Sequence, residues 1–328
     1  MLTRSIDGDV KMKKILLLLV SLLLLPAGRL GAEQLVDDNG RQVHFSKPFS
    51  RIISLYPAHT ENLFSLGLDA EIIGVAKGDD FPAAAVRERP RFHYREDAEK
   101  FIAARPDLVL VRPMIMRAYP HFIRQLEEAG ISVVSLQPTS VHEMYDYWRR
   151  LGRLTGRIQA AEMMVSAFRQ ELAALRRRTA ELRADQRKKV YFEAIHRKMK
   201  TFMPSSLAVF ALESAGGINI AADAEQVRST NIAYYGKERI LAKADDIDVF
   251  LAQQGVMNRV SKEMIRREPG FMALKAVRRG EIYIVDEHLV ARPTLRLLDG
   301  IRAIGAILYP DSFQTAKVAD SYKGHSAD

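Results

Sequence analysis

One long segment without Gly or Pro divides this chain into two halves of similar pattern. Residues 157–184 contain neither residue. Their apolar side chains fall close to one face of a helix: Met164, Phe168, Leu172, Leu175 and Leu182. Short apolar runs alternate with helical stretches on both sides of this segment. The pattern therefore predicts a connecting helix over 157–184 between two α/β lobes.

The half before this helix has the pattern of a mainly parallel sheet. Four short apolar runs predict strands at 51–55, 71–75, 107–111 and 131–135. Helical stretches separate them, at 59–66 and at 119–129, and Gly130 gives the second a normal C-terminal stop. Apolar strands alternating with helices indicate a sheet covered on both faces. We expect this lobe to span residues 33–156.

The half after the connecting helix repeats the same architecture without a detectable sequence repeat. Strands are predicted at 190–194, 247–251 and 281–285, followed by a helix over 295–308. The second lobe is expected to span 185–315, and the polar residues 316–328 form a tail.

The N-terminal residues have the pattern of a cleaved export signal. Met12-Lys13-Lys14 is a basic start, and the apolar run over 15–25 leads to Leu30-Gly31-Ala32. That run would form about 16 Å of helix, which is too short for a bilayer core of about 30 Å. We therefore expect residues 1–32 to be a signal peptide, with Met12 as an alternative start, and the mature chain to be soluble in the periplasm.

The amino-acid composition excludes several kinds of functional site. The 328 residues include no Cys, which excludes disulfides, thiolate metal sites, a Cys nucleophile and a lipidated Cys. The net charge of +9 falls to +6 once residues 1–32 are removed. A basic cluster over 176–189 is interspersed with acidic residues and has no flanking aromatics. It indicates a solvated face, and no nucleic-acid partner is predicted.

Catalytic signatures are absent from the sequence. It contains no G-x-S-x-G, no phosphate-binding loop, no G-x-G-x-x-G and no H-E-x-x-H. No two of its eight His are spaced i, i+4 as in a helical metal site. We therefore predict no catalytic residues, no resident cofactor and no metal ligands. An exported α/β enzyme stays open as an alternative because a catalytic triad assembles in space.

Five segments in order resemble one family. They are Asp37–Arg41, Arg51-Ile-Ile-Ser-Leu-Tyr-Pro-Ala-His-Thr-Glu-Asn62 with Leu66-Gly67 and Ile73–Val75, Glu99 with Arg105-Pro-Asp-Leu-Val-Leu110, Glu213–Asn219, and Arg292-Pro-Thr-Leu-Arg296 with Tyr309-Pro310. Together they resemble class III periplasmic substrate-binding proteins, the iron-siderophore, haem and cobalamin receptors of ABC importers. The resemblance covers nearly all of residues 35–310 and implies two α/β lobes bridged by one long helix, with a ligand cleft between the lobes.

The resemblance also implies a membrane partner. In this class one Glu on each lobe pairs with Arg on the permease dimer, and Glu99 and Glu238 match those positions. Each stands seven positions before a corresponding turn, at Pro106 and at Asp245. A purely local role, in which each Glu complements the positive end of a helix, is compatible with the same spacing. We expect the receptor to be a monomer.

Ligand contacts are expected where the strands end, because open α/β sheets bind ligands beyond the carboxyl ends of their strands. The loops at those ends hold aromatic, basic and imidazole side chains: Tyr56, His59, His93, Tyr94, Arg95, Arg112, His196, Arg197 and Arg292. Aromatic rings supply stacking area, and guanidinium groups pair with carboxylate or catecholate oxygens. Each of these residues could instead be ordinary loop surface, and His59 has a packing role as its alternative.

The expected ligand is a bulky metal chelate. Basic loops favour an anionic iron(III)-siderophore, with cobalamin and haem as alternatives of the same class. An oxyanion or a free metal ion is a further alternative. A free-ion site would need three or four converging ligands, and the first lobe offers only His59 and His93.

Overall fold

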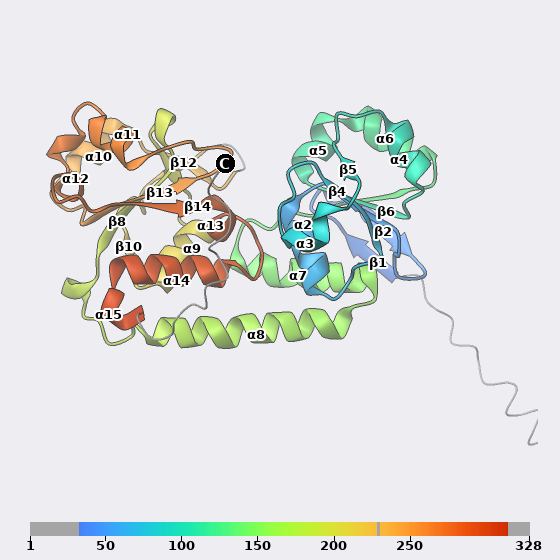
Figure 1. Ribbon diagram of the computed structural model, residues 1–328, viewed down its shortest axis with the longest axis horizontal. Helices are drawn as coiled ribbons and strands as arrows, with labels where there is room; N and C mark the ends of the chain where they lie inside the picture. Colours follow the sequence, from blue (N-terminus) through green and yellow to red (C-terminus); the bar gives the residue numbers. More distant parts are fainter. Residues whose placement is uncertain (1–32, 228–229, 314–328) are drawn as a thin grey trace, which may run out of the picture.

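Two α/β lobes stand side by side on one long helix (Figure 1). The computed structural model describes residues 33–227 and 230–313. The predicted signal peptide, residues 1–32, and the predicted tail from residue 316 lie outside the described residues. The connecting helix is α8, Ile158–Arg177.

The N-terminal lobe contains a five-stranded sheet with every pairing parallel, as the sequence predicts. Its order is β5-β4-β3-β6-β7. The strands are β3 (Ile52–Ser54), β4 (Ile72–Ala76), β5 (Arg91–Phe92), β6 (Leu108–Val111) and β7 (Ser132–Ser135). The central strands β3 and β6 are buried at every residue, which explains their continuous apolar runs. An antiparallel hairpin, β1 (Glu33–Val36) with β2 (Gln42–Phe45), precedes the sheet.

Helices cover both faces of this sheet. They are α2 (Pro57–Ser65), α3 (Ala83–Arg87), α4 (Ala98–Ala104), α5 (Pro113–Ala118), α6 (Pro120–Glu128) and α7 (Val141–Thr155). Gly130 follows α6 with a φ of 78°, so it adopts the left-handed conformation expected of a stop signal. The helix α7 was not predicted, although Ser140 caps it by accepting a hydrogen bond from the backbone N–H of Glu143.

The C-terminal lobe has a parallel centre and an antiparallel edge. Its sheet runs β11-β12-β9-β8-β13-β14, and β10 pairs beside the start of β8. The strands are β8 (Lys189–Ile195), β9 (Lys200–Phe202), β10 (Ile218–Asn219), β11 (Glu225–Gln226), β12 (Ile232–Tyr234), β13 (Val249–Gln254) and β14 (Ile282–Asp286). The three predicted strands correspond to β8, β13 and β14, which are parallel. The antiparallel members β9, β11 and β12 are two or three residues long and were not predicted.

Short helices surround this second sheet. They are α9 (Leu207–Ser214), α10 (Lys237–Ala242), α11 (Lys262–Arg267), α12 (Lys275–Arg278), α13 (Glu287–Val290), α14 (Leu297–Leu308) and α15 (Pro310–Phe313). Single 3-10 turns lie at Ala184–Gln186, His196–Lys198 and Phe271–Ala273. The predicted terminal helix corresponds to α14.

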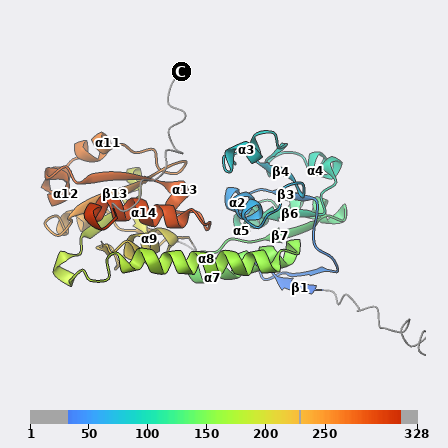
Figure 2. The same ribbon diagram turned by 60° about the horizontal axis from the view of Figure 1, so that its bottom comes forward.

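The connecting helix is shorter than predicted. It ends at Arg177 rather than at residue 184, because the chain then turns back to enter β8. The backbone N–H groups of Arg178, Thr179 and Ala180 donate to carbonyls three residues earlier, which tightens the last turn. Its 20 residues still span about 30 Å, and Figure 2 shows α8 running beneath both lobes.

One hydrophobic core extends from the first lobe through α7 and α8 into the second. The rings of Tyr145 and Trp148 on α7 pack edge-on against Phe168 of α8, with centroids 5.9 and 5.4 Å away. Separate clusters fill the outer side of each sheet. The two lobes are therefore joined at their base by one shared hydrophobic core.

Polar contacts tie the lobes together above this base. The carboxylate of Glu61 on α2 is 3% exposed and pairs with Arg292 and Arg296 of the second lobe, at 2.7 and 2.6 Å. The carbonyl of Pro293 accepts from Asn62 Nδ2 at 2.9 Å and from Trp148 Nε1 at 3.2 Å. The segment 292–296 is thus held against the first lobe.

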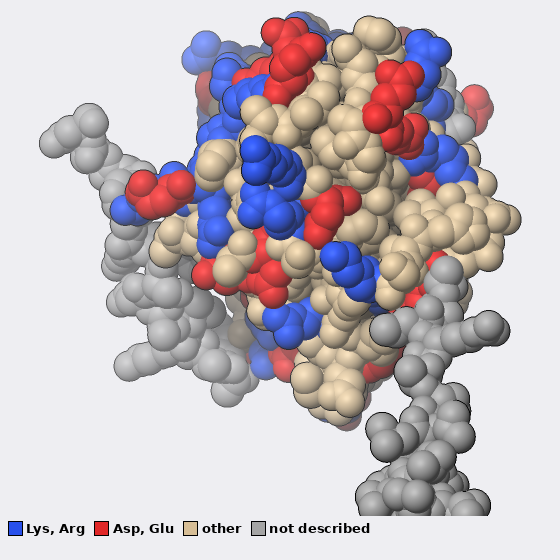
Figure 3. Space-filling model, turned by 90° about the vertical axis from the view of Figure 1, so that its right-hand side faces the viewer, with Lys and Arg blue, Asp and Glu red and all other residues tan. Residues whose placement is uncertain are grey.

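The surface mixes both signs of charge. On the end of the molecule formed by the N-terminal lobe, basic and acidic side chains lie interspersed (Figure 3), and pairs such as Arg41–Glu127 bridge them. Within 33–227 and 230–313, no helix has the length and apolar character needed to cross a bilayer.

Candidate ligand-binding site

Tyr56 and Arg112 form a stacked pair at the carboxyl ends of β3 and β6. These strands are hydrogen-bonded neighbours, so the residues just beyond them lie close together. The Arg112 guanidinium carbon lies 4.7 Å from the centre of the Tyr56 ring. Pro57 and Pro113 then start α2 and α5. The strand-end rule predicts both residues at this edge of the sheet, and the structure places them side by side.

The Tyr56–Arg112 pair lies in a partly dehydrated setting. Burial raises the pKa of the Tyr56 phenol, against the opposing effect of the Arg112 and Arg292 charges. Nε of Arg112 is buried without a hydrogen-bond partner in the described residues. The Arg112 residue as a whole is partly exposed, and a guanidinium stacked on an aromatic ring suits an acceptor group on a ligand.

His59 lies against the end of β6 but is sealed in the core. Its side chain has no exposed surface, and both ring nitrogens are engaged. Nε2 lies 3.1 Å from the carbonyl oxygen of Val111 and Nδ1 lies 2.7 Å from the Tyr147 hydroxyl. Burial lowers the pKa of His59 to about 3, so the ring is neutral. The expectation of a ligand contact fails here because His59 is the third residue of α2 and faces inward.

His93, Tyr94 and Arg95 form a second aromatic and basic group, separate from Tyr56. The His93 and Tyr94 rings are stacked with centroids 4.2 Å apart. Arg95 Nε donates to the Tyr119 hydroxyl at 3.0 Å. Tyr94, Arg95 and Tyr119 line a pocket of about 500 Å³ at α4 and α6 that contains neither Tyr56 nor Arg112. The expected single wall of Tyr56, Tyr94, Arg95 and Arg112 is therefore two groups.

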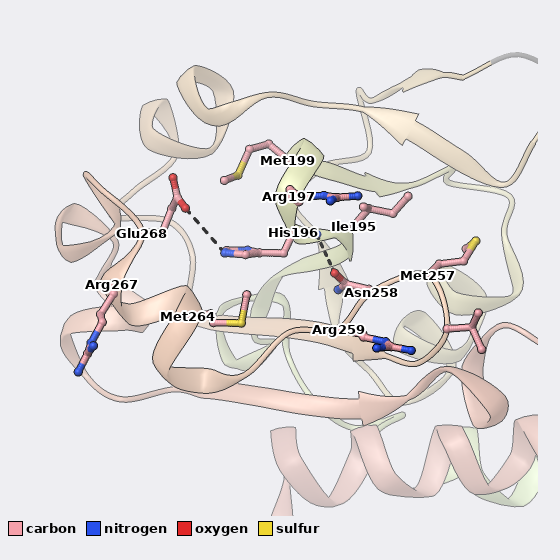
Figure 4. Close-up of a pocket in the computed structure, with 11 residues that line it drawn as sticks. Ile195, His196, Arg197, Met199, Met257, Asn258, Arg259, Met264, Arg267 and Glu268 are labelled. Carbon is pink, nitrogen blue, oxygen red and sulfur yellow. Dashed lines mark hydrogen bonds and ion pairs between the residues drawn. The ribbon is translucent and has the colours of Figure 1, made fainter.

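The larger pocket lies in the C-terminal lobe, at the carboxyl ends of β8 and β13 (Figure 4). Its volume is about 690 Å³, within the range of small-molecule sites. The predicted residues His196 and Arg197 line it. The other lining residues are Ile195, Met199, Val256, Met257, Asn258, Arg259, Met264, Arg267 and Glu268. Met257, Asn258 and Glu268 were not predicted, because no local sequence pattern marks them.

Charge in this pocket is arranged around His196. Its Nδ1 lies 3.0 Å from Oε2 of Glu193, a residue of β8 with no exposed surface. Burial raises the pKa of Glu193, and its hydrogen bond to His196 opposes that shift. Burial alone would lower the pKa of His196, but the hydrogen bond and charge of Glu193, with the charge of Glu268, raise it.

The rim of the pocket is basic. Arg197 and Arg259 are exposed, and neither is in an ion pair with another residue of the described chain. Arg267 pairs with Glu263. The apolar lining combined with unpaired guanidinium groups suits an anionic ligand with an apolar body.

Arg292 lines neither of these two pockets. Its side chain is 11% exposed and is committed to Glu61 and, at 3.2 Å, to Asp80. Arg292 was expected to contact the ligand, but its side chain is instead engaged in the link between the lobes. Glu61 and Arg296, which complete this link, were quoted in the resembling segments but were assigned no role.

The two predicted docking carboxylates lie on separate lobes. Glu99 is exposed in the first turn of α4, and Glu238 is exposed in the first turn of α10. Neither pairs with a basic side chain in residues 33–227 or 230–313. Figure 1 shows α4 and α10 on the side of the molecule opposite α8, one on each lobe.

No cluster of three or more His, Asp or Glu that could hold a metal ion occurs in the described part of the chain. His59 is sealed in the core, and His93 Nδ1 accepts a hydrogen bond from the backbone of Arg95 at 3.2 Å. The requirement for a free-ion receptor, three or four converging ligands, is not met by these residues.

Two α/β lobes on a single helical backbone, with pockets at strand ends, define a class III substrate-binding protein. The chain belongs to the periplasmic binding protein family, whose model matches residues 52–289. The segments that carry the resemblance in the sequence lie largely within this match.

Individual relatives agree with this assignment. An uncharacterised ABC transporter substrate-binding lipoprotein of Bacillus subtilis is 28% identical over 287 residues, covering 85% of this chain and 86% of that protein. A vitamin B12-binding protein of Vibrio cholerae is 25% identical over 262 residues, covering 79% and 90%. A periplasmic solute-binding protein of known structure from Staphylococcus epidermidis has a TM-score of 0.70 at 26% identity, covering 80% and 100%.

Proposed function

We propose that this protein is the periplasmic receptor of an ABC importer, and that it captures an iron(III)-siderophore-type metal chelate and delivers it to the membrane permease. The observation that carries this proposal is the pocket of about 690 Å³ at the ends of β8 and β13, with Arg197 and Arg259 unpaired at its rim. In this proposal the protein binds its ligand without changing it chemically and holds no cofactor of its own.

The first lobe would supply the facing contacts. The stacked and partly exposed Tyr56 and Arg112 would supply them at the ends of β3 and β6. A chelate held between these side chains and the C-terminal pocket would be shielded from water on two sides. We retain Tyr56, Arg112, His196 and Arg197 as ligand-contacting residues, and assign Tyr94, Arg95 and His93 to the rim of the first lobe.

Cobalamin is the second candidate. The vitamin B12-binding protein of Vibrio cholerae covers 79% of this chain, and the Met side chains of the pocket offer adaptable apolar contact for a large ring. Cobalamin is neutral at its amide-bearing edge, so it would make little use of Arg197 and Arg259. The two arginines thus discriminate between the candidates.

The test is a titration of the purified protein with ferric siderophores, cobalamins and haem, followed by calorimetry. A ferric siderophore is expected to bind with a Kd below about 10 μM, and the Arg197→Ala, Arg259→Ala double variant is expected to weaken it. Preference for cobalamin, unaffected by that double variant, would select the second candidate. Failure of every chelate to bind would refute the receptor.

Docking to a permease dimer is proposed through Glu99 and Glu238. Each lobe would present one carboxylate to a basic residue of one permease subunit. Exposed ion pairs contribute only about 0–1 kcal/mol each, so these contacts would set register and speed encounter more than they would add affinity. A monomeric receptor fits this arrangement, since the two lobes already supply two points.

A further inference from the structure

The imidazole of His288, on α13 of the C-terminal lobe, reaches across to the N-terminal lobe. Its Nδ1 lies 3.2 Å from Oδ2 of Asp80, which stands in the loop 77–82 between β4 and α3. Figure 2 shows α13 on the side of its lobe that is nearest the N-terminal lobe. The His288 side chain is 22% exposed, so this contact between the lobes stays within reach of protons from solvent.

Three carboxylates surround this imidazole. Besides Asp80, Oδ1 of Asp286 lies 3.6 Å from Nδ1, and Oε1 of Glu287 lies 4.0 Å from Nε2. The backbone N–H of His288 donates to Oδ1 of Asp286 at 2.8 Å, which fixes the position of the residue at the start of α13. Among the ion pairs of the described residues, Arg292 pairs with Asp80 but with neither Asp286 nor Glu287. His288 is therefore the group that can bring a positive charge to all three carboxylates.

The two nitrogens of the His288 ring face different parts of the molecule. Nδ1 faces Asp80 of the N-terminal lobe, and Nε2 faces Glu287 of the C-terminal lobe. A neutral imidazole has a proton on one nitrogen only, so it donates to one carboxylate and turns a lone pair toward the other. An imidazolium donates from both nitrogens. Imidazole is also the side chain that ordinarily gains its proton between about pH 5 and pH 8.

Glu287 extends this contact to the pocket of the C-terminal lobe. Its side chain packs directly on Gly255, where a Cβ would lie 1.9 Å from the carboxylate carbon. Oε2 of Glu287 accepts from the backbone N–H of Met257 at 3.5 Å. Met257 lines the pocket of about 690 Å³. The loop 255–257 at the pocket and the contact between the lobes therefore share one carboxylate.

We propose that His288 is a proton-operated latch between the two lobes. When the ring takes up a proton from solvent, the imidazolium ties Asp80 of the N-terminal lobe to Glu287, and through Glu287 it steadies the loop 255–257. The lobes hold together more firmly as pH falls below neutral and separate more readily as pH rises. This inference goes beyond the proposed receptor function, because it concerns the protein without ligand and is independent of the ligand's identity.

Hydrogen exchange of the protein without ligand, followed by mass spectrometry at about pH 6.5 and about pH 8, tests the latch. The backbone N–H groups of Lys77 and Asp79 donate to carbonyls of the N-terminal lobe, and that of Met257 donates to Glu287. Peptides covering 77–81 and 255–258 therefore report on the two ends of the latch. After correction for the intrinsic effect of pH on exchange, both are expected to be about two- to fivefold better protected at the lower pH.

Two variants remove the latch without removing its side-chain volume. His288→Gln keeps an N–H donor toward Asp80 but cannot take up a proton, so the pH difference is expected to disappear. Asp80→Asn removes the charge that the imidazolium attracts and is expected to have the same effect on the 77–81 peptide. His142→Gln is the matched control, since His142 is exposed on α7, and it is expected to keep the wild-type difference.

A further variant separates the latch from its neighbour Asp79. Burial raises the pKa of Asp79 to about 6, so the chosen pH range lies above most of its titration. Asp79→Asn is expected to keep the difference between the two pH values.

Spin labels provide an independent readout, because the chain contains no Cys. Glu128→Cys and Met272→Cys place one label on an exposed position of each lobe. The distribution of distances between the labels is expected to be narrower at about pH 6.5 than at about pH 8, and His288→Gln is expected to remove this change.

The inference is overturned if wild type protects both peptides equally at the two pH values, or if the difference survives in His288→Gln. A difference confined to 77–81 would also overturn it, because the latch would then not reach the pocket. None of these results depends on whether a chelate binds, so the latch and the receptor function fail separately.

Discussion

Arg296 of the C-terminal lobe grips Glu61 of the N-terminal lobe with two hydrogen bonds, from Nε to Oε2 at 3.0 Å and from Nη2 to Oε1 at 2.6 Å. Arg292 adds a third, to Oε1 at 2.7 Å. Bidentate pairs of this kind fix geometry as well as adding energy. The contact lies above the packed base formed by α7 and α8, so the lobes are connected at two levels.

Glu61→Ala is expected to destabilise the protein by about 3–5 kcal/mol, because it leaves the largely buried Arg296 without a carboxylate partner and Arg292 with only the exposed Asp80. Urea unfolding measures the change. Trp148, the single Trp, hydrogen-bonds Pro293 beside this link, so its emission is expected to shift toward the red in the variant.

The matched control for Glu61→Ala is Asp80→Ala. Asp80 also pairs with Arg292, but its side chain is 49% exposed, so its loss is expected to cost no more than about 1 kcal/mol. Equal effects of the two substitutions would show that burial of Glu61 does not govern the strength of the link.

Tyr147→Phe is expected to cost about 1–3 kcal/mol, because it leaves buried polar atoms without a partner. Val111 offers only a carbonyl to His59 Nε2, so that nitrogen carries the proton and Nδ1 accepts from the Tyr147 hydroxyl. Asn62 Nδ2 donates to the same hydroxyl at 3.2 Å. The control Tyr283→Phe removes a partly exposed hydroxyl bonded to Glu281 and is expected to have a smaller effect on the urea midpoint.

Two buried groups are expected to give opposite pH dependences that largely cancel. Burial lowers the pKa of His59 from 6.5 to about 3, so its contribution to stability is complete above pH 6.5 and is lost as pH falls toward 3. Burial raises the pKa of Asp79 from 3.8 to about 6, so the native state keeps a proton on Asp79 that the unfolded chain has lost. The stability that this proton contributes to the protein is therefore lost as pH rises from about 4 to 6.

Asp79→Asn removes the second of these effects. Between pH 6 and pH 4 the free energy of unfolding of the variant is expected to fall, relative to wild type, by about 1 kcal/mol per pH unit. Denaturant curves over this range give both profiles. Parallel profiles for the two proteins would contradict the raised pKa of Asp79.

Glu99→Ala combined with Glu238→Ala is expected to abolish uptake of the ligand by cells while leaving its affinity for the purified protein unchanged. Both carboxylates are exposed; Glu99 lines the pocket of the first lobe at α4 and α6, but neither residue lines the pocket of the second lobe, where the ligand is expected to bind. Glu128→Ala, in an exposed residue at the end of α6, serves as the control. A loss of affinity in the double variant would place these residues at the ligand and not at the permease.

Much of this architecture could be predicted because its main strands correspond to short local runs of apolar residues in the sequence. The strands at 51–55 and 107–111 are buried on both faces, so every residue of the observed strands is constrained to be apolar or small. The helix α7 could have been found as well, from Ser140 and Glu143 at capping-box spacing before Met144 and Trp148. The antiparallel edge could not, because strands of two or three residues are defined only by the strands they pair with.

The site was partly predictable for a related reason. Parallel strands end at one edge, so the sequence could place Tyr56 and Arg112 at the same edge of the sheet, while only the structure shows that their strands are neighbours. His59 and Arg292 also stand in loops or helix starts that follow strand ends in the sequence, but the direction in which a side chain points depends on packing. His59 lies on the inward face of α2 and contacts Tyr147. Arg292 of the second lobe pairs with the carboxylate of Glu61 on the first lobe. Glu268 lies far along the chain from His196, and only the folded chain brings them together.

The chain passes from the first lobe to the second only once in the described residues, and this affects the order in which the two lobes can fold. Every strand of the first sheet comes from residues before 136, and every strand of the second from residues after 188. The first lobe can therefore complete its sheet as soon as residues up to 135 are available, without waiting for a distant strand. Arg292 and Arg296 emerge almost last, so the bond that unites the lobes forms only after both are built.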